Sequence, residues 1–138
     1  MLDIKFIREN AELVKMAAKK KKITVDVDRL LAVDDQRREI MTSLENRKAE
    51  QNRFSLDIVQ AGQDQIRRNH LILEMQDLKA EIQQAEESLK PVMVEWQAIM
   101  LQIPNIPDMS VPDGESDKDN LEIKVWGEQT KFNFPAKD

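Results

Sequence analysis

Two runs of apolar residues, spaced alternately three and four positions apart, constrain the fold of this chain more than any other feature. In residues 30–61, seven of the ten positions in the run are apolar: Leu30, Val33, Ile40, Leu44, Phe54, Ile58 and Ala61. In residues 71–103, all ten are apolar: Leu71, Met75, Leu78, Ile82, Ala85, Leu89, Val92, Trp96, Ile99 and Ile103. An apolar seam sustained over this length is typical of coiled-coil helices.

A short segment that contains Gly62 separates the two runs and predicts a turn. Two long helices joined by so short a turn lie antiparallel. A single register then places apolar residues opposite each other: Leu30 and Ile99, Val33 and Trp96, Ile40 and Leu89, Leu44 and Ala85, Phe54 and Met75, and Ile58 and Leu71. We therefore predict a coiled-coil arm over residues 26–103, with its tip within residues 60–66 and each helix roughly 50 Å long.

Polar seam positions and one proline interrupt this pattern. The polar positions are Arg37, Arg47 and Gln51. Such side chains either pack their stems and extend their polar heads into water, or specify the register. Pro91 removes a backbone hydrogen bond in mid-helix at a cost of about 3 kcal/mol. Because the seam stays in phase from Leu89 to Val92, we predict a kink at Pro91 rather than a helix end.

The segments that flank the arm have a different character. Residues 1–25 predict a small base of one or two short helices that ends in the four lysines at 19–22. These lysines are either a solvated helix end, which the helix dipole favours, or a contact for phosphate. After Ile103, two prolines end the helix, and residues 104–138 predict an acidic linker with a strand-like tail, because apolar and charged residues alternate over 121–125. The expected fold is mainly α, with an extended tail.

Several classes of functional site are missing from the sequence. There is no cysteine, which excludes disulfides, thiolate metal sites and cysteine nucleophiles. His70 is the only histidine and is expected to face solvent, and no phosphate loop, dinucleotide fingerprint or metal-ligand cluster occurs. No apolar run approaches the roughly 20 residues that span a bilayer, and the N-terminus lacks a signal-peptide pattern. We expect a cytoplasmic chain with no catalytic site, cofactor or metal of its own and no membrane contact.

The distribution of charge is more informative than the net charge of −5. Residues 1–25 and 46–70 are net basic in an otherwise acidic chain. In the second island the cations gather on the distal part of the predicted arm: Arg47, Lys48, Arg53, Arg67 and Arg68. Arginine suits phosphate because its planar fork donates two hydrogen bonds. These residues predict an interface for structured RNA, read through backbone and shape. The alternative is a structural or protein-binding hairpin with no RNA role.

Several stretches, in the same order, also resemble one family. They are MLDIKFIREN at 1–10, LLAVDDQRR at 30–38, IPNIP at 103–107, SVP at 110–112 and, most specific, DNLEIKVWGE at 119–128. They resemble the N-terminal part of bacterial seryl-tRNA synthetases, and the likeness covers the whole chain. The departures are Ala11, where a proline often follows the asparagine, the helix breaker Pro91, and an arm tip that is less basic than in many members.

The resemblance implies a function. In that family the arm grips the long variable arm and the elbow of serine tRNA by shape and phosphate contacts. The parent enzyme attaches serine to this tRNA, using ATP and a divalent metal ion in a class II catalytic domain. That domain also forms a homodimer, in which the arm of one subunit presents the tRNA to the other subunit. Since the class II motifs do not occur in residues 1–138, we expect a tRNA-binding arm without an active site.

Overall fold

A computed structural model describes residues 2–108, 110–128, 133 and 134. By its internal contacts the chain divides into two units, residues 1–106 and residues 107–138. The first unit contains α1 (Ile4–Glu9), α2 (Ala11–Lys20), α3 (Val27–Gln60) and α4 (Gln65–Met100). The second unit contains one short 3-10 helix, η1 (Asp117–Asp119), among its described residues.

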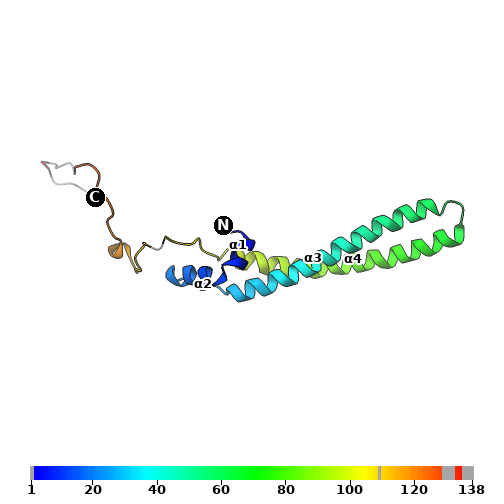
Figure 1. Cartoon of the computed structure of the whole chain (residues 1–138), viewed down its shortest axis with the longest axis horizontal. Helices are drawn as coiled ribbons and strands as arrows, with labels where there is room; N and C mark the ends of the chain where they lie inside the picture. Colours follow the sequence, from blue (N-terminus) through cyan, green and yellow to red (C-terminus); the bar gives the residue numbers. More distant parts are fainter. Residues whose placement is uncertain (1, 109, 129–132, 135–138) are drawn as a thin grey trace. The chain divides into compact units, whose positions relative to one another are not determined.

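The arm is an antiparallel hairpin of α3 and α4, which lie side by side (Figure 1). Each helix starts at an aspartate cap: the Asp26 carboxylate accepts the backbone N–H of Arg29 at 2.8 Å, and Asp64 accepts that of Arg67 at 3.1 Å. Residues 61–64 form the turn, where Gly62 adopts a φ of 54° that glycine tolerates best. The predicted helical hairpin is therefore confirmed.

Two apolar clusters hold the first unit together. The cluster at the base joins α1, α2, α3 and the end of α4: Ile7, Val14, Val27, Leu30, Met100 and Ile103. The cluster in the arm has Leu44, Leu78 and Ile82 at its centre, with Ile40, Phe54, Ala85 and Leu89 packed against them. Every residue of the arm cluster occupies a seam position predicted from the sequence. The alternating spacing thus identified the buried face of both long helices.

The interruptions of the seam are accommodated without ending a helix. Arg37 places its guanidinium 4.9 Å from the centre of the Trp96 ring on α4. Arg47 extends its head to Glu81 across the hairpin, as expected for a side chain that packs its stem and keeps its charge near water. α4 runs through Pro91 without a break, and the kink there stays a prediction. The helix ends at Met100, before the predicted Ile103, because residues 101–103 tighten into a turn and Pro104 has no N–H to donate.

The tail corrects one expectation. The alternating residues 121–125 form no strand, and neither does any other described part of the chain. A strand requires a neighbouring strand to satisfy its backbone groups, and none is present among the described residues. Leu121, Ile123 and Trp126 are 72%, 92% and 91% exposed, so this apolar segment contacts almost nothing. Residues 129–132 and 135–138 of the predicted tail lie outside the described residues.

Candidate nucleic-acid interface

The five cations predicted to bind RNA all belong to the distal half of the arm, but two of them are already paired. Arg47 Nε donates to Glu81 Oε2 at 3.0 Å, and Lys48 Nζ donates to Glu86 Oε1 at 2.7 Å. Both bonds cross from α3 to α4. Carboxylates of the arm therefore offset much of the positive charge of these two residues, which makes them weaker candidates for binding phosphate.

The other three cations, Arg53, Arg67 and Arg68, are exposed. Their side chains enter no ion pair with any residue that the structure describes. Arg67 and Arg68 lie in the first turn of α4, where the helix dipole favours negative rather than positive charge. Helix stability therefore gives no reason for two arginines at this position. Their guanidinium groups are free to bind an anion from solvent.

Further polar and apolar side chains surround these arginines at the tip. Gln65 donates to Asn69 at 3.3 Å, and Ser55 donates to the Gln51 carbonyl at 2.9 Å. His70 is 73% exposed and lies 3.4 Å from Glu74, so the prediction that it faces solvent is confirmed. Large apolar residues are also exposed there: Leu56 at 63%, Val59 at 77% and Ile66 at 85%. The tip thus combines free hydrogen-bond donors with apolar surface.

The lysines at 19–22 lie at the C-terminal end of α2. Arg67 and Arg68, in contrast, lie at the N-terminal end of α4. Lys19 and Lys20 lie in the last turn of α2, where the dipole favours cations, and Lys21 and Lys22 follow directly after it. Nearby, Lys15 donates to Asp28 on α3 and to Glu12, both at 2.9 Å. The hydrogen bonds that Lys15 donates, first to Asp28 and next to Glu12, raise the pKa of Lys15. Helix termination and packing account for this basic segment more simply than they account for the tip arginines.

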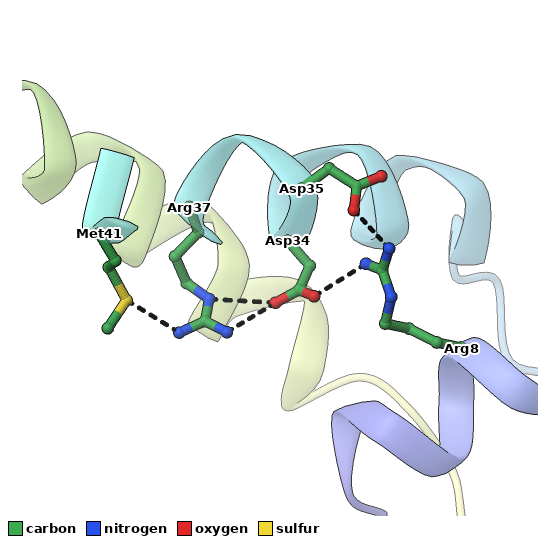
Figure 2. A network of polar contacts seen from close by, with 5 residues as sticks. All are labelled: Arg8, Asp34, Asp35, Arg37 and Met41. Carbon is green, nitrogen blue, oxygen red and sulfur yellow. Dashed lines mark hydrogen bonds and ion pairs between the residues drawn. The ribbon is translucent and has the colours of Figure 1, made fainter. Parts of the chain in front are cut away.

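The sequence reasoning missed a buried carboxylate at the base of the arm. The side chain of Asp34 is 1% exposed and accepts hydrogen bonds from two arginines. Arg8 Nη1 donates to Oδ2 at 2.9 Å, while Arg37 donates to Oδ1 through Nε at 3.0 Å and Nη2 at 2.8 Å (Figure 2). Arg8 also donates to Asp35, and this bond is the main cause that raises the pKa of Arg8. The only sequence signal was the pair of acids followed by two arginines at 34–38.

Within residues 2–108, 110–128, 133 and 134, no group of three or more His, Cys, Asp or Glu side chains could hold a metal ion. None of the described helices is long and apolar enough to cross a membrane.

Comparisons with known proteins place these features in a family. Residues 1–107 match the family described as the Seryl-tRNA synthetase N-terminal domain. Serine--tRNA ligase of Carboxydothermus hydrogenoformans is 37% identical over 137 residues, and that of Caldanaerobacter subterraneus subsp. tengcongensis is 42% identical over 137 residues. In both cases the match covers 99% of this chain and 32% of the relative, so the chain spans about a third of these proteins.

A solved structure is similar as well. It is the crystal structure of seryl-tRNA synthetase from Pyrococcus horikoshii complexed with ATP, at 28% sequence identity and a TM-score of 0.70. The match covers 92% of this chain and 29% of that chain. Because the family model covers residues 1–107, which include the base and the whole arm, the chain belongs to the seryl-tRNA synthetase N-terminal domain family.

Proposed function

We propose that this chain binds serine tRNA through the distal part of its arm. Arg53, Arg67 and Arg68 contact phosphates there, and Arg47 and Lys48 contribute mainly to the local potential. The observation that carries the proposal is the pair of exposed arginines in the first turn of α4, without an ion-pair partner among the described residues. The contacts are made mainly to the RNA backbone, because no Phe, Tyr or Trp side chain is exposed in the described tip and His70 is the one exposed aromatic ring there on which a base could stack.

For the complete protein we infer the activity of its relatives. It attaches serine to the bound tRNA, with ATP and a divalent metal ion, in the two thirds of the relatives' length that this chain does not span. The solved Pyrococcus horikoshii relative was complexed with ATP, which supports the choice of nucleotide. We further infer that the complete protein is a cytoplasmic homodimer, as the family resemblance implies.

The first experiment tests binding itself. The chain is titrated with serine tRNA and with a tRNA that has a short variable arm, and complexes are measured by filter binding at several salt concentrations. We expect tighter binding of serine tRNA, with an affinity that falls linearly with salt on logarithmic axes. If neither RNA binds at low salt, the hairpin is a structural or protein-binding element, a role that its ion pairs across the arm and its net negative charge would suit.

The second experiment locates the contacts. Replacing both Arg67 and Arg68 by alanine should weaken binding of serine tRNA and reduce the salt slope by about 0.7 to 0.9 for each lost contact. The matched control replaces Lys19 and Lys21, which are also exposed and carry the same total charge. Helicity and melting should stay nearly unchanged in both variants, because exposed cations contribute little to stability. If the control loses more affinity than the tip variant, the RNA lies along the base and the distal model is wrong.

A further inference from the structure

We propose that Asp34 is a positioning residue that sets the angle between α1 and the arm. This inference goes beyond the proposed function, and its test requires no RNA. It gives a role to two of the family-like stretches that the RNA interface leaves unused, residues 1–10 and residues 30–38. Arg8 belongs to the first stretch, and Asp34, Asp35 and Arg37 belong to the second.

Asp34 on α3 binds one arginine of α1 and one of its own helix, and the second arginine extends the network to α4. Oδ2 accepts Arg8 from α1 at 2.9 Å, and Oδ1 accepts both donors of Arg37 at 2.8 and 3.0 Å. The guanidinium of Arg37 in turn lies over the ring of Trp96 on α4. Figure 2 shows Arg8 and Arg37 approaching the carboxylate from opposite sides. Each oxygen is bonded to a different arginine, Oδ2 to Arg8 of α1 and Oδ1 to Arg37 of α3, so rotation of α1 about the arm would break the bond to Arg8.

The apolar cluster beside this network does not by itself fix the orientation of α1 relative to the arm. Ile7 is the one fully buried residue of α1, and it packs into the cluster at the base. Ile4 of α1 packs against the same cluster but is only partly buried. Apolar contacts are non-directional, so a six-residue helix held by one fully buried and one partly buried side chain can pivot with little loss of burial. Hydrogen bonds to charged groups require defined distances and angles. A charged group that loses its partner in a buried site destabilises the fold, because it has lost water without gaining a hydrogen bond. The network therefore restricts orientations that the cluster permits.

Stability alone gives no reason for a carboxylate at this position. Replacing a buried ion network by apolar residues of similar size is often neutral or stabilising, whereas removing one member is costly. The effect of the network on the orientation of α1 and its effect on the stability of the fold can therefore be separated by experiment. A small rotation is also measurable at the arm, because Ala49 lies about 22 Å further along α3 than Asp34 and a change of about 10° moves it by about 4 Å.

The measurement uses spin labels on engineered cysteines, one in α1 and one in the arm. The chain contains no cysteine, so labels attach only where they are introduced, at Lys5→Cys and Ala49→Cys. Both positions are exposed. The distribution of distances between the labels is recorded by pulsed electron resonance, together with helicity and melting temperature. We expect a single narrow distribution for the otherwise unchanged chain.

Four variants then test the carboxylate. Asp34→Asn and Arg8→Gln should each broaden the distance distribution at temperatures well below melting. Asp35→Asn is the matched control, because Asp35 also binds Arg8 but its side chain is 61% exposed, and it should leave the distribution narrow. The triple change Arg8→Met, Asp34→Leu and Arg37→Met should recover most of the melting temperature lost in Asp34→Asn while the distribution stays broad.

Several results would overturn the proposal. One is a narrow, unshifted distribution in the Arg8→Gln variant, which removes the link to α1 but leaves the Asp34–Arg37 pair and is expected to fold. A second is a triple variant that is narrow as well as stable, since apolar packing would then suffice to set the direction. A third is a distance distribution that broadens as much in the Asp35→Asn control as in Asp34→Asn, because the buried carboxylate would then have no special role.

Discussion

Truncation of Leu44 to alanine tests whether the seam holds the arm together. Leu44 is 6% exposed and packs with Leu78 and Ile82, which are 7% and 8% exposed. The change removes three carbons, and at about 0.8 kcal/mol for each the lost transfer free energy is about 2.4 kcal/mol. A residual cavity raises the cost of such changes to as much as about 5 kcal/mol in enclosed cores.

Leu44→Ala is expected to lower the free energy of unfolding by about 2 to 3 kcal/mol, near the lower end of that range. The arm is only two helices thick, so neighbouring side chains and water can fill the space from its open sides. Leu30 provides the contrasting case. It is 0% exposed and lies in the base cluster among residues of α1, α2, α3 and α4, so Leu30→Ala should cost about 3 to 5 kcal/mol.

Urea unfolding followed by the helical circular dichroism signal gives the free energy of unfolding for each variant. The control is Leu73→Ala, on the same helix pair but 59% exposed, which should change the free energy by no more than about 0.5 kcal/mol. Equal costs for Leu44→Ala and Leu73→Ala, or a cost below about 1 kcal/mol for Leu44→Ala, would show that the buried face has been assigned wrongly.

Four further predictions concern other parts of the chain. Cysteines at Leu44 and Ala85 should cross-link within one chain, and preferential cross-linking of a shifted pair would refute the register. Pro91→Ala should raise the free energy of unfolding by about 1 to 3 kcal/mol in the same urea assay, since it restores a backbone donor inside α4. The Asp119 carboxylate accepts the backbone N–H groups of residues 115 and 116, which lower its pKa. The turn around η1 should therefore keep this stabilisation above the ordinary aspartate pKa and lose it as pH falls through the lowered value, which a carbon-detected NMR titration would show as a depressed midpoint. Finally, the chain should support no serine-dependent pyrophosphate exchange, and activity that co-purifies with it would contradict this.

The sequence by itself determined the helices, the turn and the buried face of the arm. Helical hydrogen bonds join residues four positions apart, and caps such as Asp26 and Asp64 act within one turn, so these features depend on local order. The seam is periodic and therefore shows which face of each helix is buried, while the register of pairing stays a prediction. A strand, in contrast, depends on a distant partner, and the alternation at 121–125 predicted one that the described residues do not form.

Only the tertiary structure decided which charges are free and which are engaged. Arg47 and Glu81 are 34 residues apart in the sequence, and Arg8 and Asp34 are 26 apart, yet both pairs form hydrogen bonds. Such pairs depend on how the helices rotate and cross, which the spacing of apolar residues constrains only coarsely. The five distal cations were thus equivalent in the sequence, while the fold left Arg53, Arg67 and Arg68 without ion-pair partners among the described residues. The burial of Asp34 was also decided by the fold, because Arg8 and the base cluster come from helices that meet α3 only after folding, although Arg37 is a neighbour on the same helix.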